Sequence, residues 1–384
     1  MKTIEANRLN NVSEYYFSKK LREINEINQN GIQVINLGIG SPDLEPPKVV
    51  INTLTTWSTQ NNVHGYQRYN GIPELRLAIK KWSKKVYDIS LNADTEILPL
   101  MGSKEGIHHI TQAFVNKGDK VLVPMLGYPT YRTVSNLAQA IVAEYSIKLD
   151  GSFDLEELSS LLGGNTKVLW LNYPHMPTGV PPNKKAITQL IGLANENGCI
   201  VINDNPYSTI LTDDLFSIFQ IDGAKENCLE LNSLSTSHNM SGWRVGWVSG
   251  KTELIQSILK VKSNMDSGMF LPIQKAAISA LNISTDWIKQ LNLIYSERRK
   301  VVWEILDKLN CSYAKNNVGL FIWARIPDRY DSGEIWTNEV LYKAKVFITP
   351  GFIFGSSGNK FVRVSLCNST EVLGEALKRI NNLK

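Results

Sequence analysis

The middle of the chain, from about residue 95 to residue 250, alternates short, wholly apolar runs with stretches of helical periodicity. Such runs lie at 121–123, 168–171, 200–202 and 229–231, and turn-forming residues bound each of them. Apolar residues in immediate succession, rather than at every second position, indicate strands that are buried on both faces, as in a parallel sheet covered by helices. We therefore predict an α/β fold with a mostly parallel central sheet flanked by helices.

The ends of the chain follow a different pattern. Two apolar runs, at 319–324 and 361–366, lie among helical stretches and predict a smaller α+β lobe. The chain has 384 residues, which is more than one typical domain needs, so a second lobe is expected. We predict an N-terminal segment at 1–45 that joins the small domain, a large domain at 46–284 and a small C-terminal domain at 285–384.

Charge and cysteine content exclude several classes of protein. The chain carries 41 Lys and Arg against 36 Asp and Glu, and a net charge of +5 on a chain of this size argues against nucleic-acid or membrane-surface binding. The four cysteines include no C-x-x-C pair, so we expect neither a metal site nor a disulfide framework. We find no apolar leader and no apolar stretch of about 18 residues, which predicts a cytoplasmic protein without a membrane segment.

Polar, glycine-containing stretches follow the apolar runs. They lie at 102–106, 127–131, 172–179, 204–207 and 233–246. Ligands of parallel sheets bind beyond the carboxyl ends of the strands, so we expect these stretches to form one site. Small residues at a helix N-terminus, serines and an arginine suit a phosphate. A carboxylate, an aromatic ring and a tyrosine hydroxyl beside them suit a flat heteroaromatic ring that carries this phosphate.

The order and spacing of these motifs resemble the class I/II, fold-type-I, pyridoxal-phosphate (PLP) aminotransferases, in the aspartate-aminotransferase-like group, over nearly the whole chain. The matching parts are 38–43, 66–76, 102–106, Tyr128, 172–179, 204–207, 233–246 and Arg363. The resemblance implies a fold-type-I homodimer that binds PLP or its amine form, PMP, and takes a small-molecule carboxylate substrate. Tyr66 would reach the cofactor phosphate of the other subunit.

The resemblance also implies which residues hold the cofactor. Asp204 would pair with the pyridinium nitrogen, Tyr128 would stack on the ring, and Tyr207 would donate to the phenolic oxygen. The phosphate would be bound by Ser103, Lys104, Ser233, Ser235 and Arg244. The substrate would be bound by Gly40, Asn172 and Arg363. Arg363 would bind the α-carboxylate through both arms of its guanidinium, a geometry that lysine lacks.

Two residues depart from the family pattern at the expected reaction centre. Thr236 stands where the family has its Schiff-base lysine, and a hydroxyl can neither form that bond nor act as the amine base. Met176 stands at the cofactor-binding position where the family has an asparagine, and a thioether donates no hydrogen bond. His175, His238 and Tyr66 are candidates for a replacement base, although either histidine could equally be a structural residue that points away.

These departures leave three functions open. We expect an enzyme that binds PLP or PMP noncovalently and acts on an amino or keto acid through a non-standard mechanism, because the cofactor-binding residues are retained. The second possibility is a catalytically inactive, aminotransferase-like binding protein, and the third is a PLP-independent enzyme that uses the old cofactor pocket for another substrate. Arg363 favours a carboxylate substrate, but no second cation can be assigned to a dicarboxylic one.

Overall fold

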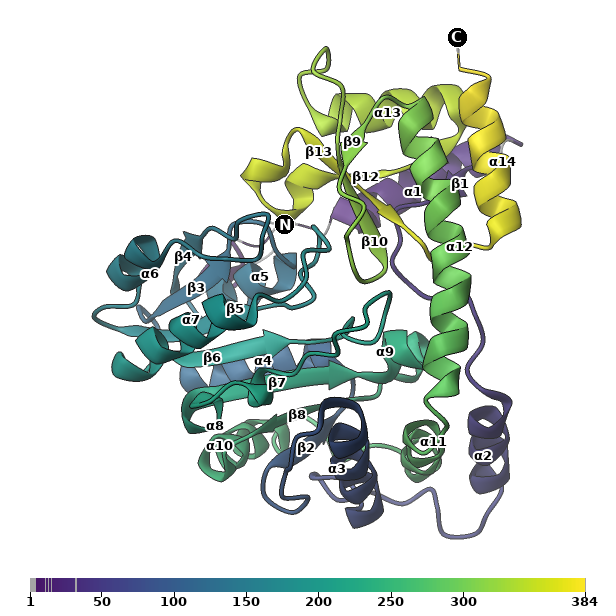
Figure 1. The fold of residues 1–384 in the computed structure, drawn as a ribbon. Helices are drawn as coiled ribbons and strands as arrows, with labels where there is room; N and C mark the ends of the chain where they lie inside the picture. Colours follow the sequence, from purple (N-terminus) through teal and green to yellow (C-terminus); the bar gives the residue numbers. More distant parts are fainter. Residues whose placement is uncertain (1–4, 11, 13, 15, 32, 384) are drawn as a thin grey trace.

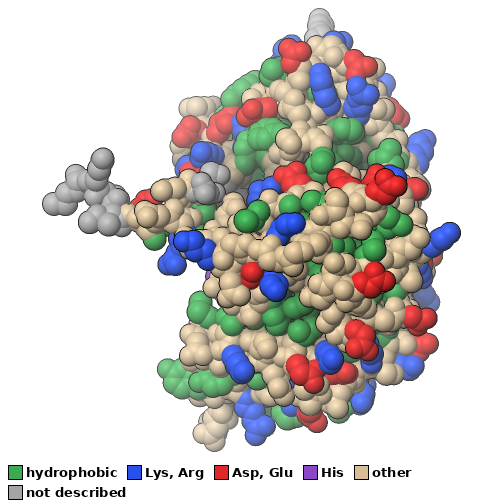
Figure 2. Space-filling view, turned by 90° about the vertical axis from the view of Figure 1, so that its left-hand side faces the viewer, with side chains coloured by type: hydrophobic (Ala, Val, Ile, Leu, Met, Phe, Trp, Pro, Cys, Tyr) green, Lys and Arg blue, Asp and Glu red, His purple; other side chains and the backbone are tan. Residues whose placement is uncertain are grey.

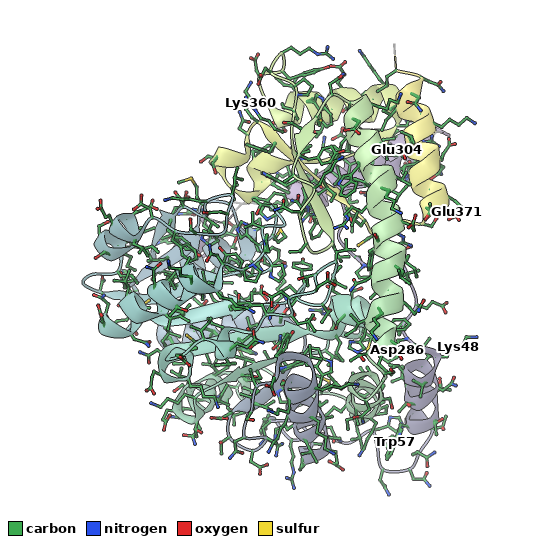
Figure 3. The ribbon with its side chains drawn as sticks, in the orientation of Figure 1. Lys48, Trp57, Asp286, Glu304, Lys360 and Glu371 are labelled. Atoms are coloured by element: carbon green, nitrogen blue, oxygen red, sulfur yellow. The ribbon has the colours of Figure 1, made fainter. Side chains whose placement is uncertain are left out.

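The chain forms two lobes that are joined by one long helix, α12 (Asp286–Lys308), as Figure 1 shows. This computed structural model describes residues 5–10, 12, 14, 16–31 and 33–383. Figure 3 labels Asp286 at the beginning of α12 and Glu304 near its other end, and the helix runs between the lobes from one label to the other.

The larger lobe is built on a seven-stranded sheet with the strand order β2-β8-β7-β6-β5-β3-β4. Its strands are β2 (Ile97–Leu100), β3 (Lys120–Pro124), β4 (Ile141–Tyr145), β5 (Thr166–Leu171), β6 (Ile200–Asp204), β7 (Cys228–Ser233) and β8 (Gly246–Gly250). Strand β8 is antiparallel to both of its neighbours, whereas the pairings from β7 to β4 are all parallel. The predicted α/β fold with a mostly parallel sheet is confirmed.

Both faces of this sheet are covered by helices, which explains the wholly apolar runs. In β5, Val168 and Trp170 pack on one face with α4, α5 and α10, while Leu169 and Leu171 pack on the other face with α6 and α7. The helices of this lobe are α2 (Lys48–Ser58), α3 (Pro73–Tyr87), α4 (Ser103–Phe114), α5 (Pro129–Leu137), α6 (Leu155–Leu161), α7 (Lys184–Glu196), α8 (Ala224–Asn227), α9 (Leu234–Ser237), α10 (Thr252–Lys262) and α11 (Leu271–Leu281).

The smaller lobe contains a four-stranded antiparallel sheet in the order β12-β13-β10-β9. Its elements are β9 (Ser312–Tyr313), β10 (Phe321–Arg325), α13 (Gly333–Ala344), β11 (Val346–Phe347), β12 (Thr349–Pro350), β13 (Phe361–Ser365) and α14 (Thr370–Asn381). The N-terminal elements α1 (Tyr16–Gln29) and β1 (Ile35–Asn36) lie with this lobe, and β1 pairs in parallel with β11. The predicted domain boundaries at 45/46 and 284/285 stay predictions.

The surface is mixed in charge. Figure 2 shows Lys and Arg side chains interspersed with Asp and Glu side chains over one face of the molecule. Among the residues described, no helix combines the length and the apolar character that are needed to cross a membrane.

Candidate cofactor and substrate site

A cavity of about 630 Å³ lies at the carboxyl ends of the central strands, where the large lobe faces the small one. A volume of this size suits a cofactor or other small molecule. From the predicted site residues, the cavity is lined by Gly40, Ser103, Lys104, Tyr128, Asn172, Met176, Asp204, Tyr207, Ser233, Ser235, Thr236, Arg244 and Arg363. These residues come from seven separate segments of the sequence, which the fold brings together around one cavity.

One end of the cavity is an anion cup at the N-terminus of α4. Gly102 precedes the helix with a φ of 89°, and a Cβ built on it would lie 2.0 Å from Nη2 of Arg244. The guanidinium therefore lies directly against the helix N-terminus, where free N–H groups already favour an anion. Ser233 and Ser235 complete this cup, and the Ser233 hydroxyl donates to Oγ of Ser235 at 2.9 Å. The donor set fits a phosphate.

Asp204, which ends β6, presents a carboxylate inside the cavity. The hydroxyl of Tyr131 donates to its Oδ2 at 2.7 Å, whereas its Oδ1 is buried and has no hydrogen-bond partner among the described residues. Burial raises the pKa of Asp204 to about 6, while the bond from Tyr131 lowers it. A buried carboxylate oxygen that no described residue hydrogen-bonds needs a donor, and a protonated pyridine nitrogen is one.

Two tyrosines border the space beside Asp204. Tyr128, the residue before α5, lies edge-on to Tyr131 at 5.8 Å between ring centroids, and Tyr207 lies edge-on to Phe321 at 5.7 Å. Burial raises the pKa of Tyr207, so its hydroxyl stays protonated at neutral pH and can donate. Together with Asp204 and the anion cup, these rings fit a pyridine ring that carries a phosphate.

Arg363 on β13 lies at the other end of the cavity. Its Nη2 donates to the carbonyl oxygen of Gly38 at 2.9 Å, and its guanidinium carbon lies 3.9 Å from the ring centroid of Phe321 and 4.6 Å from that of Phe354. The Sδ atom of Met176 lies 3.4 Å from Nη1. A planar cation held between aromatic rings suits the carboxylate of a small substrate.

Gly40 and Asn172 have structural reasons for their identity. A Cβ on Gly40 would lie 2.3 Å from Cζ of Phe321, so only glycine fits beside this ring. The side chain of Asn172 donates from Nδ2 to the carbonyl oxygen of Asp204 at 2.5 Å and accepts at Oδ1 from the backbone N–H of Met176 at 2.9 Å. Asn172 therefore holds the backbone of Asp204 and the backbone of Met176 in fixed positions relative to each other.

Thr236 on α9 lines the cavity and is buried. It stands where the resemblance to the family places the Schiff-base lysine, and it offers a hydroxyl there. Among the described residues that line the cavity, Lys104 is the only lysine. Its Nζ lies 5.8 Å from the ring centroid of Tyr128.

Three predicted residues lie outside this cavity. His175 is buried between the Thr178 hydroxyl at 2.6 Å from Nδ1 and the carbonyl oxygen of Leu126 at 2.9 Å from Nε2, and burial lowers its pKa to about 4. His238 is also buried, with Nδ1 at 2.8 Å from the hydroxyl of Ser237, and burial lowers its pKa to about 4. Both imidazoles are held by protein groups and do not reach the cavity.

Tyr66 is the third of these residues. Its side chain is 93% exposed and lines a separate hollow with residues 67–70, 259, 263 and 267. Within one copy of the chain, it makes no approach to the anion cup.

Sequence reasoning missed several residues that shape the site. Tyr131 lies only three positions after Tyr128 and within the polar stretch at 127–131, so its place in the motif was a usable signal. Phe17 on α1 and Phe354 line the cavity because the small lobe folds over it, and nothing in their local sequence indicates this.

One charged cluster lies away from the cavity. Glu105, His109 and Asp266 bring their ligand atoms within 4.8 Å of one another, a grouping that the sequence does not predict. The ammonium of Lys262 already lies 2.8 Å from Asp266, and this buried ion pair gives the cluster a structural explanation without a metal.

The comparisons with known proteins agree with this geometry. The family model described as aminotransferase class I and II matches residues 32–380. An LL-diaminopimelate aminotransferase of Aquifex aeolicus is 36% identical over 99% of each chain, and one of Dehalococcoides mccartyi is 37% identical over 99% of this chain and 98% of its own. The structure of apo BacF from Bacillus subtilis is 30% identical, with a TM-score of 0.94 over 98% of each chain.

These findings contradict one expectation from the sequence. Thr236 and Met176 lead us to expect a non-standard enzyme with noncovalent PLP or PMP, with an inactive binding protein or a PLP-independent enzyme as the alternatives. The curated relatives that match over nearly their full length carry the name of an aminotransferase. Two changed residues therefore count for less than a match that extends over nearly the whole chain.

Proposed function

Because the chain belongs to the aminotransferase class I and II family, we propose that it transfers an amino group between an α-amino acid and a 2-oxo acid. The observation that carries the proposal is the buried Oδ1 of Asp204, which has no hydrogen-bond partner among the described residues and lies in the same cavity as the anion cup. A pyridine phosphate satisfies both at once. When bound, PLP supplies a ring that withdraws electrons from the bonds of the amino acid's Cα.

The chain's own residues have separate tasks in this proposal. The N-terminus of α4 and Arg244 bind the phosphate, and Asp204 keeps the ring nitrogen protonated through a charge-assisted hydrogen bond. Arg363 would orient the substrate by its α-carboxylate, and the Tyr207 hydroxyl would donate a hydrogen bond to the ring's phenolic oxygen. All of these contacts are noncovalent, and they apply to PLP and PMP alike.

Amino transfer is tested directly with a ¹⁵N-labelled donor. The protein is supplied with PLP and an unlabelled 2-oxo acid, and mass spectrometry follows the label into the new amino acid. The relatives' name makes LL-diaminopimelate the first donor to test, followed by a panel of α-amino acids. We expect transfer with at least one donor and a large loss in Asp204→Asn; a protein that holds PLP but transfers no label from any donor refutes the proposed activity.

We also propose that the working form is a homodimer. Supporting this, Tyr66 and Tyr69 are exposed and line the separate hollow, and Met265 and Phe270, which lie close in sequence to its residues 263 and 267, are exposed as well. Exposed aromatic and Met side chains are enriched at protein interfaces. Sedimentation should give twice the chain mass at micromolar concentration, and Tyr66→Glu should weaken association more than Leu149→Glu, a change at a residue that is 86% exposed elsewhere.

A further inference from the structure

The two carboxylate oxygens of Asp204 lie in different surroundings because one neighbouring residue, Tyr131, hydrogen-bonds only one of them. The Tyr131 hydroxyl donates to Oδ2 at 2.7 Å, and the described residues provide no hydrogen-bond partner for Oδ1. Both side chains are almost completely buried, with 1% of Tyr131 and 5% of Asp204 exposed. Water therefore does not compete for Oδ2, and Tyr131 decides which oxygen remains available to a ligand.

Tyr131 itself is held rigidly. Its ring stacks on Trp170 at 4.9 Å between centroids with an interplanar angle of 7°, and it meets Tyr128 edge-on at 83°. Trp170 is fully buried in β5, so the stack cannot slide without opening the core. The stacked ring therefore holds the phenol oxygen in place beside the carboxylate of Asp204.

The protonation states support a fixed donor and a variable acceptor. Burial and the neighbouring Asp204 raise the pKa of Tyr131 well above its ordinary value, so it remains a donor. A hydrogen bond to the charged form favours ionisation of Asp204 and opposes the effect of burial. Asp204 also raises the pKa of Tyr207, and Tyr207 and Tyr128 add to the raised pKa of Tyr131, so these two phenols are the other titratable groups beside the pair.

We propose that Tyr131 is a positioning residue that fixes Oδ2 of Asp204 and keeps the carboxylate ionised, so that Oδ1 meets the ring nitrogen of the bound pyridine phosphate. This inference rests on the proposed function, because it requires a ligand whose ring nitrogen is protonated. The proton of Tyr131 stays on its phenol oxygen throughout.

The test uses Tyr131→Phe, which keeps the ring stack and removes the hydroxyl, with PMP as the probe because PMP has no aldehyde. The dissociation constant for PMP is measured by equilibrium dialysis between pH 5 and pH 9. We expect it to rise about tenfold at pH 7, a typical effect of losing a hydrogen bond to a charged group. The pH below which binding is lost should also rise, because Asp204 then holds its proton more tightly.

A matched control removes another buried phenol bond. Tyr145 is completely buried, and its hydroxyl donates to the carbonyl oxygen of Trp170 at 2.7 Å instead of to Asp204. Tyr145→Phe should lower stability while leaving PMP affinity and its pH profile unchanged. A Tyr131→Phe protein that binds PMP like the parent at every pH overturns the inference.

A double variant keeps the test informative even if Tyr131→Phe alone fails to fold. In an Asp204→Asn background there is no carboxylate to position, so adding Tyr131→Phe should change the PMP dissociation constant less than twofold. A tenfold change in that background overturns the inference, since Tyr131 would then act independently of Asp204. A parent protein that binds no PMP refutes the proposed function instead, so the two failures are distinguishable.

Discussion

We expect the ionised carboxylate of Asp204 to lower the free energy of unfolding of the cofactor-free protein and to raise that of the protein with bound PMP. Burial raises its pKa from the ordinary value of 3.8 to about 6, so the folded state binds the proton more tightly than the unfolded state does. The stability from this proton is fully present below pH 3.8 and is lost as the pH rises through about 6. At pH 8 the ionised carboxylate should cost the empty protein about 3 kcal/mol, and at pH 5 about half of this.

The substitution Asp204→Asn removes this ionisation and nearly preserves the side-chain shape. The variant, free of cofactor, should therefore exceed the parent in free energy of unfolding by up to about 3 kcal/mol at pH 8, with a smaller gain at pH 5. Urea denaturation at the two pH values measures the difference. Asp88→Asn is the control, because the Asp88 side chain is 87% exposed and should change stability by only about 0.5 kcal/mol.

Added PMP should reverse the order of stability. A ligand that binds only the folded state stabilises it according to its affinity. The loss of a charge-assisted hydrogen bond to Oδ1 should weaken PMP binding by about 1.5 to 3 kcal/mol, so saturating PMP protects the parent far more than the variant. The reasoning is refuted if Asp204→Asn is no more stable than the parent at pH 8, or if PMP protects both proteins equally.

Two further substitutions probe the other ends of the cavity. Thr236→Lys should place an amine near the PLP aldehyde, so that borohydride reduction gives an adduct that mass spectrometry locates at residue 236, whereas Thr236→Val gives none there. Arg363→Lys should raise KM for the amino donor by about tenfold or more through loss of the two-armed contact, while the dissociation constant for PMP stays unchanged.

In the large lobe, the strands that the sequence predicted are those in the buried middle of the sheet. The runs at 121–123, 168–171, 200–202 and 229–231 lie in β3, β5, β6 and β7, because a strand with helices on both faces needs apolar residues at every position. Strand β8 escaped prediction because two of its five residues are glycines and a third is serine. Its glycines have a packing reason, since a Cβ on Gly246 would lie 2.7 Å from the backbone nitrogen of Ser103.

The site could be predicted where it depends on strand ends and could not where it depends on the meeting of the two lobes. Ser103, Asp204 and Ser233 follow or end strands of one sheet, and parallel strands bring such residues to a common edge. Phe17 and Phe354 reach the same cavity from the small lobe. Their positions depend on how α12 and the N-terminal segment place the small lobe relative to the large one. No local sequence pattern predicts this arrangement.

Met176 shows that a changed motif residue can alter one contact and leave the rest of its loop intact. Its backbone is held by Asn172, which also binds the carbonyl oxygen of Asp204, whereas its Sδ atom lies 3.4 Å from Nη1 of Arg363. Met176→Asn should therefore leave the ring-nitrogen partner in place and exchange a thioether for an amide beside the guanidinium. We expect a change in KM for the carboxylate substrate together with an unchanged pH profile of PMP binding. A shift in that pH profile would show that the side chain at residue 176 also acts on Asp204, and that the loop does not separate the two tasks.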